Sequence, residues 1–116
     1  MQQIDMPIIH KTYELYSAVH ILEKSIPKME RYTLWQRSEN AVLDVLEGFL
    51  QAGYLSQEKR VDHLLRISVR VDILRVFLRL SLDTKAINHK KYIALQQAVD
   101  EIGRMLGGWM KSLKQK

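Results

Sequence analysis

The sequence predicts an all-α protein that folds as an antiparallel up-down four-helix bundle. Apolar residues recur every three or four positions in four long segments, which is the spacing of a helix with one buried face. Glycine (5) and proline (2) are scarce, so long uninterrupted helices are favoured. The connections between segments are short, which favours antiparallel neighbours. The 116 residues suit one domain over positions 1–116, and a hydrophobic content of 47% is enough for a core.

The first helix is expected at residues 8–25 and the second at 28–52. Pro27 lies between them and suits the first turn of a new helix. The core stripe of the first helix consists of Ile8, Thr12, Leu15, Val19, Leu22 and Ile26. That of the second consists of Tyr32, Trp35, Val42, Leu43, Leu46, Phe49 and Leu50. Each helix has a polar opposite face, as expected for a helix that packs on one core.

The third helix is expected at residues 57–82 and the fourth at 89–113. Ser56 precedes the third helix and is a suitable N-cap, while Asp83 and Asn88 bracket the turn before the fourth. The core stripe of the fourth helix consists of Tyr92, Leu95, Val99, Ile102, Leu106, Trp109 and Leu113.

The third helix carries two apolar stripes instead of one. At about 100° per residue the two stripes lie on nearly opposite sides of the helix. The first consists of Leu64, Ile67, Val71, Leu74 and Leu78. The second, which we call the outer stripe, consists of Leu65, Val69, Ile73, Val76 and Leu80. One stripe suffices for the core of a bundle, and a second one left in water favours aggregation.

The outer stripe therefore predicts self-association. Tyr13 and Tyr16 extend the expected interface on the first helix, in a second stripe that also holds Ile9 and His20. A dimer or a closed ring would hide every copy of the outer stripe. The alternative is an asymmetric monomer in which the third helix is simply more central.

Cationic side chains lie between the two stripes of the third helix. One sector holds Lys59, His63, Arg66 and Arg70, and the other side holds Arg75 and Arg79. Together with a net charge of +5, these six residues are candidates for contact with the phosphates of RNA or DNA. Alternatively, Arg75 or Arg79 forms a structural ion pair with Glu39, which falls within the apolar stripe of the second helix.

No pattern indicates catalysis, so we expect a binding protein and not an enzyme. Cysteine is absent, and the four histidines include no pair at helical metal-binding spacing. Glu-x-x-His pairs and phosphate-binding glycine loops are also missing, so neither metal nor cofactor is expected. No apolar run reaches membrane-spanning length, and residues 1–7 lack the pattern of a signal peptide. We therefore expect a cytoplasmic protein without membrane contact.

Two segments resemble a family of small four-helix bundles. Pro27-Lys28-Met29-Glu30-Arg31-Tyr32-Thr33-Leu34 matches the family signature Pro-Lys-x-x-Arg-(Tyr/Phe)-x-Leu. The family includes the accessory variability determinant (Avd) proteins of diversity-generating retroelements and the proteins encoded in 23S ribosomal RNA intervening sequences. Leu74-Arg75-Val76-Phe77-Leu78-Arg79-Leu80 resembles the Avd branch in particular. The second branch shows Asn-Ile-x-Glu-Gly, of which Asp44-Val45-Leu46-Glu47-Gly48 keeps only Glu-Gly.

The resemblance implies a homopentameric barrel with a basic surface. It also implies a non-catalytic accessory protein that binds the retroelement reverse transcriptase and its template RNA or DNA, and that supports mutagenic synthesis of complementary DNA. The alternative is a bundle of the intervening-sequence type that acts as a protein-interaction module without a nucleic-acid role.

Overall fold

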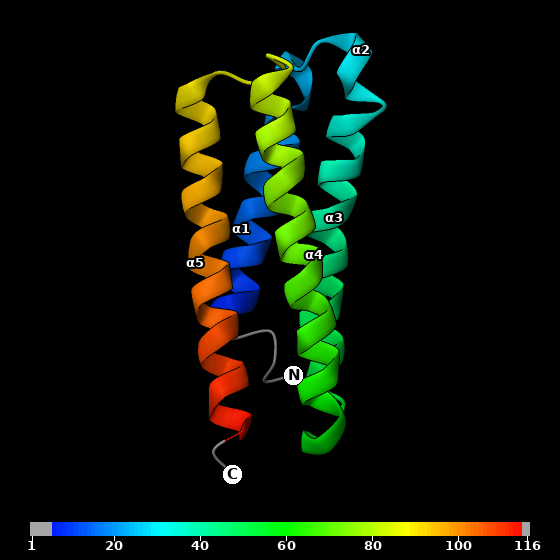
Figure 1. The fold of residues 1–116 in the computed structure, drawn as a ribbon. Helices are drawn as coiled ribbons and strands as arrows, with labels where there is room; N and C mark the ends of the chain where they lie inside the picture. The colour runs from blue at the N-terminus through cyan, green and yellow to red at the C-terminus, as the bar shows by residue number, and fades with distance from the viewer. Residues whose placement is uncertain (1–5, 115–116) are drawn as a thin grey trace.

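The computed structural model describes residues 6–114. Residues 1–5, on which the expectation of a missing signal peptide largely rests, and residues 115–116 lie outside this range. The helices are α1 (Pro7–Ile21), η2 (Leu22–Ser25), α2 (Lys28–Arg31), α3 (Leu34–Ala52), α4 (Gln57–Asp83) and α5 (His89–Lys114). The structure has no strand within residues 6–114, and α1, α3, α4 and α5 lie side by side as a helical bundle (Figure 1).

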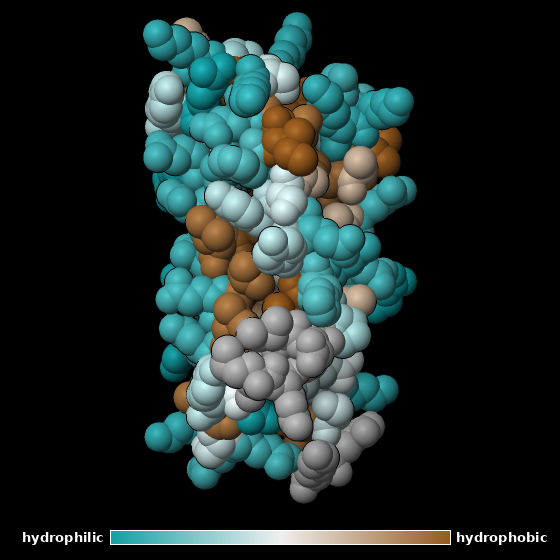
Figure 2. Space-filling model, turned by 180° about the vertical axis from the view of Figure 1, so that it is seen from behind, coloured by the Kyte–Doolittle hydropathy of each residue, from teal (hydrophilic) through white to brown (hydrophobic). Residues whose placement is uncertain are grey.

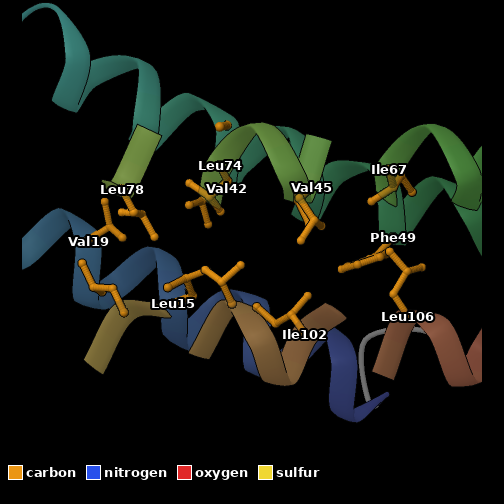
Figure 3. Close-up of a cluster of buried hydrophobic side chains, with 14 of the residues drawn as sticks. Leu15, Val19, Val42, Val45, Phe49, Ile67, Leu74, Leu78, Ile102 and Leu106 are labelled. Carbon is orange, nitrogen blue, oxygen red and sulfur yellow. The ribbon is translucent and has the colours of Figure 1, made fainter. Parts of the chain in front are cut away.

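The four long helices enclose one hydrophobic core. Helix α3 packs against α4, α4 packs against α5, and α1 contacts both α3 and α5, so the helices form a closed cycle around the core. Figure 3 shows side chains from all four helices pointing into this space, among them Leu15, Val45, Leu74 and Ile102. The bundle is 47 Å along its longest axis.

The core stripe predicted for α4 is buried as expected. The side chains concerned are Leu64, Ile67, Val71, Leu74 and Leu78. The stripe predicted for the second helix is partly wrong, because Tyr32 is 63% exposed and Leu43 is 39% exposed. Ala41 and Val45 fill the core instead, so this helix is rotated slightly from the orientation that its apolar periodicity suggested.

The single helix expected at 28–52 is divided into α2 and α3. The break lies at Thr33, whose backbone has φ −121° and ψ −99°. The Thr33 hydroxyl donates to the carbonyl oxygens of Met29 (3.2 Å) and Glu30 (3.4 Å). A threonine side chain that bonds the preceding turn competes with the helical backbone pattern, which explains why the helix does not continue.

A hydrogen bond inside the core connects α1 to α3. The indole Nε1 of Trp35 donates to the carbonyl oxygen of Val19 at 3.2 Å, and both residues are fully buried. Because the donor of a buried indole needs a partner, this bond fixes the register of the two helices.

Side chains also cap the junction between α3 and α4. The Ser56 hydroxyl accepts from the backbone N–H of Lys59 at 3.4 Å, which confirms the predicted N-cap. The guanidinium of Arg60 donates to the carbonyl oxygens of Ala52 (2.8 Å) and Leu55 (2.7 Å) at the end of α3.

Within residues 6–114, no helix combines the length and the apolar character that a membrane crossing requires.

Candidate interaction surface on α4

The outer stripe of α4 is exposed along its whole length in the single chain. The exposed fractions are 53% for Leu65, 57% for Val69, 41% for Ile73, 57% for Val76 and 42% for Leu80. Helix α4 therefore buries only one of its two apolar stripes within its own bundle. The expectation that a more central α4 buries both stripes within one bundle is therefore wrong for residues 6–114.

On α1, the structure separates the residues that were expected to extend this surface. Tyr13 is 65% exposed, while Tyr16 is half-buried and stacks on the His20 ring at 5.7 Å between ring centroids. Ile9 is 5% exposed and belongs to the core, so its assignment to an outer surface was wrong. Figure 2 shows the molecule from behind, where hydrophobic side chains form separate patches among hydrophilic ones.

The first sector of cations lines a groove between α3 and α4. His63 lies with its Nε2 2.8 Å from the carbonyl oxygen of Gly48, so His63 bridges the two helices. Arg66 lines three adjoining surface hollows, one toward Lys59, one toward Gly48 and one toward Val69 of the outer stripe. No hydrogen bond or ion pair holds the guanidinium of Arg66 within residues 6–114, so it can accept an external anion.

The neighbouring cations differ in how they are held. Arg70 lies 3.6 Å from Asp44 of α3, measured between Nη1 and Oδ2, and both side chains are at least half exposed. An exposed pair of this kind contributes little to stability and can exchange its carboxylate for a phosphate. The side chain of Lys59 is exposed at the start of α4. Lys59, His63, Arg66 and Arg70 therefore lie on one side of α4, and we call them the cation row.

Sequence reasoning missed one cation at the contact between α3 and α4. Arg37 of α3 lies over the ring of Phe77 of α4, with 5.3 Å between its guanidinium carbon and the ring centroid. Phe77 follows Arg70 by seven residues, so it lies on the same side of α4 as the cation row, two turns further along the helix. The spacing of Phe77 was readable from the sequence. The position of Arg37 depends on how α3 packs against α4.

Arg75 and Arg79 lie on the other side of α4 and are both ion-paired. Arg75 reaches Asp72 through Nη1 and Asp100 of α5 through Nη2, each at 3.4 Å. Arg79 lies 3.2 Å from Asp83. A hydrogen bond with Tyr92, followed by the charge of Asp83, raises the pKa of Arg79 above its ordinary value.

The expected pairing of Arg75 or Arg79 with Glu39 is wrong. Glu39 faces α1, where its Oε2 lies 3.8 Å from Nδ1 of His20. The periodicity placed Glu39 on the inner side of its helix correctly, since its side chain is only 13% exposed. It could not indicate which neighbouring helix that side would meet.

A comparison with known families decides the relationship of this chain. A family model described as bAvd-like matches residues 6–113. The chain belongs to the bAvd-like family. This membership confirms the resemblance to Avd proteins and supports an accessory protein of the Avd type, with a role in protein interaction. No curated protein matches the chain.

In this bAvd-like protein, both resembling segments have a structural explanation. Arg31 of the first segment donates through Nη2 to the carbonyl oxygens of Lys24 (3.3 Å) and Ile26 (3.2 Å), and so closes the turn between η2 and α2. In the second segment, Leu74 and Leu78 enter the core while Val76 and Leu80 remain exposed. The second segment thus carries part of both stripes of α4.

Proposed function

We propose that this bAvd-like protein is a non-catalytic accessory protein of a diversity-generating retroelement. In this proposal the chain is an up-down four-helix bundle that assembles as a homopentameric barrel in the cytoplasm. The barrel binds the reverse transcriptase and the template RNA or DNA, and it supports mutagenic synthesis of complementary DNA. Membership of the family supports the accessory role.

The observation that carries the proposal is the position of the cation row beside the outer stripe. Both features lie on α4, and the hollow formed by Arg66, Val69, Arg70 and Ile73 joins them. Contacts between the outer stripes of neighbouring chains would place every copy of the cation row at the same height of the assembly. Repetition would convert the modest charge of one chain into a continuous basic surface.

The length of this surface suits a nucleic-acid backbone. Lys59 and Phe77 are eighteen positions apart, which corresponds to about 27 Å of helix at 1.5 Å per residue. Arginine offers planar, bidentate donors to phosphate. Phe77 adds an aromatic ring beside Arg37 further along α4, and rings of this kind stack with unpaired bases.

The charge-reversed double variant Arg66→Glu with Arg70→Glu tests the nucleic-acid role. We expect the variant to lose its affinity for RNA, while its helicity, measured by circular dichroism, and the mass of its assembly stay unchanged. A plot of log affinity against log salt concentration should be less steep for the variant than for the wild type, by about 0.7 in slope for each single-strand phosphate contact removed. Fluorescence anisotropy with a labelled single-stranded RNA, measured over a salt series, gives both quantities.

The matched control is Lys90→Glu with Lys111→Glu on α5, which produces the same change of net charge away from the α3–α4 groove. We expect this control to retain most of the RNA affinity. Equal loss in both variants would show that only net charge matters. Salt-insensitive or absent RNA binding by an intact wild-type assembly would favour the protein-interaction module of the intervening-sequence type.

A further inference from the structure

Three metal-ligating side chains converge where the end of α1 meets α3. His20 lies in the last turn of α1, Glu23 in η2 and Glu39 in α3. Nδ1 of His20 is 3.7 Å from Oε2 of Glu23 and 3.8 Å from Oε2 of Glu39. One potential ligand atom from each residue lies within 4.8 Å of the others. The cluster is on α1, η2 and α3, and it includes no residue of the cation row or the outer stripe of α4.

The surrounding structure holds the three side chains in place. His20 and Glu23 are three positions apart, so they lie on one face of the chain as α1 passes into η2. The ring of Tyr16 stacks on the imidazole at an interplanar angle of 17°. The hydrogen bond from Trp35 to Val19 fixes α3 against α1 one turn before Glu39. Both the imidazole and the second carboxylate are therefore positioned before any ligand arrives.

The cluster has more acceptor capacity than its own groups can satisfy. Oε1 of Glu39 is buried and has no hydrogen-bond partner within residues 6–114. Burial raises the pKa of the Glu39 carboxyl, and the nearby charge of Glu23 raises it further, whereas His20 acts in the opposite direction. The cluster holds two carboxylates and one imidazole, and one imidazole carries at most one positive charge, so the two carboxylates have an excess of negative charge. A divalent cation bound at Oε2 of Glu39 would supply this charge to the carboxylate that also carries the unpaired Oε1.

We propose that His20, Glu23 and Glu39 form a binding site for a first-row divalent transition metal ion such as Zn²⁺. Ligands about 2.1 Å from a tetrahedral Zn²⁺ are about 3.4 Å apart. The separations of 3.7 Å and 3.8 Å from His20 are close to this value, and the two carboxylate oxygens lie within 4.8 Å of each other, so they would move closer together around the ion. The imidazole nitrogen favours such a metal over Mg²⁺ and Ca²⁺, which take oxygen ligands.

Three protein ligands leave the fourth position of the metal to water or to an external ligand. The metal would connect α1 to α3 across the η2–α2 turn and brace this end of the bundle. The sequence did not reveal the site, because it contains no Glu-x-x-His pair and no closely spaced histidines. The reversed order, His20-x-x-Glu23, supplies only two ligands, and the third comes from another helix.

Isothermal titration of the metal-free full chain with Zn²⁺, followed by thermal unfolding with and without the ion, tests the site. We expect one ion per chain and a higher Tm in Zn²⁺. Loss of a residue that only hydrogen-bonds to a metal ligand lowers metal affinity about 10–100-fold. Loss of a ligand itself should cost more, so the variants His20→Gln and Glu39→Gln should each bind Zn²⁺ more than about 100-fold more weakly. Circular dichroism of the metal-free variants verifies that they remain folded.

The matched control is His10→Gln, which removes an exposed histidine from the same helix outside the cluster. This variant should bind Zn²⁺ as the wild type does. The absence of binding by the wild type would overturn the proposal, as would an equal loss of affinity in His10→Gln. Both results are independent of RNA affinity, so the failure of this site and the failure of the proposed function are distinguishable.

Discussion

The carbonyl oxygen of Gly48 lies 2.8 Å from Nε2 of His63, at a point where α3 and α4 approach each other closely. Gly48 is buried, and a Cβ placed on it would lie 2.8 Å from Cγ1 and Cδ1 of Ile67. The absence of a side chain at position 48 thus allows both the packing of Ile67 and the contact of the His63 ring with the backbone of α3. The Glu47-Gly48 pair lies at this contact.

The substitution Gly48→Ala should destabilise the protein despite the better helix propensity of alanine. Overpacking of a core costs about 1–3 kcal/mol, whereas replacing a helical glycine by alanine gains about 1 kcal/mol. We expect a net loss of about 1 kcal/mol in the free energy of unfolding, measured by urea denaturation. The control Gly107→Ala should gain stability, because no atom lies within 4 Å of a Cβ added there. Equal effects at the two glycines would contradict the close approach of the helices.

Removal of the Arg31 side chain should loosen the junction between η2 and α2. The variant Arg31→Ala loses two charge-assisted hydrogen bonds to backbone carbonyls. We expect a loss of about 1–2 kcal/mol in the free energy of unfolding, at the low end for such bonds because the site is partly exposed. The neighbouring control Lys28→Ala removes an exposed side chain and should change stability by less than about 0.5 kcal/mol. Comparable losses in both variants would refute the capping role of Arg31.

Glu39 should make the stability of the metal-free protein depend on pH. Its folded-state pKa is raised above the ordinary value of 4.5. The folded chain therefore holds this proton more tightly than the unfolded chain, and stability falls as pH rises from 4.5 through the raised pKa. Glu39→Gln removes the charge, so this variant should be the more stable protein at neutral pH in chelator-treated buffer. Its advantage should shrink as the pH falls through the raised pKa toward 4.5 and should stay constant below that value.

Urea denaturation of the wild type and of Glu39→Gln over a pH series measures this difference. A constant difference across the series would show that Glu39 carries no shifted pKa. Addition of Zn²⁺ should reverse the order at neutral pH, because the ion stabilises only the protein that keeps the carboxylate.

A charge in the outer stripe should dissociate the assembly without unfolding the chain. Val69 is 57% exposed, so Val69→Glu places the carboxylate in water in the single chain and in an apolar interface in the assembly. Light scattering after size exclusion should give a mass near the 13.6 kDa of one chain, with helicity unchanged. The control Met29→Glu, at an 83% exposed site on α2, should retain the assembly mass. An unchanged mass for Val69→Glu would refute the interface.

Helical periodicity by itself determined that the two apolar stripes of α4 lie on opposite sides of the helix, so that a single core can bury only one of them. The relative directions of Leu74 and Val76 follow from 3.6 residues per turn, whatever the other helices do. Ser56 as an N-cap likewise depends on groups only three residues away. Local geometry of this kind is encoded within a short stretch of chain, so the sequence was sufficient to predict it.

Only the tertiary structure decided which side chains meet across helices. Glu39 was correctly expected to be inward-facing, but its partner His20 depends on the rotation of α3 against α1, which the buried contact of Trp35 with Val19 sets. The same packing placed Arg37 over Phe77. Periodicity gives the angle at which a side chain projects from the axis of its own helix. The distance and register between two axes come from the fit of whole helix surfaces, which no single segment contains.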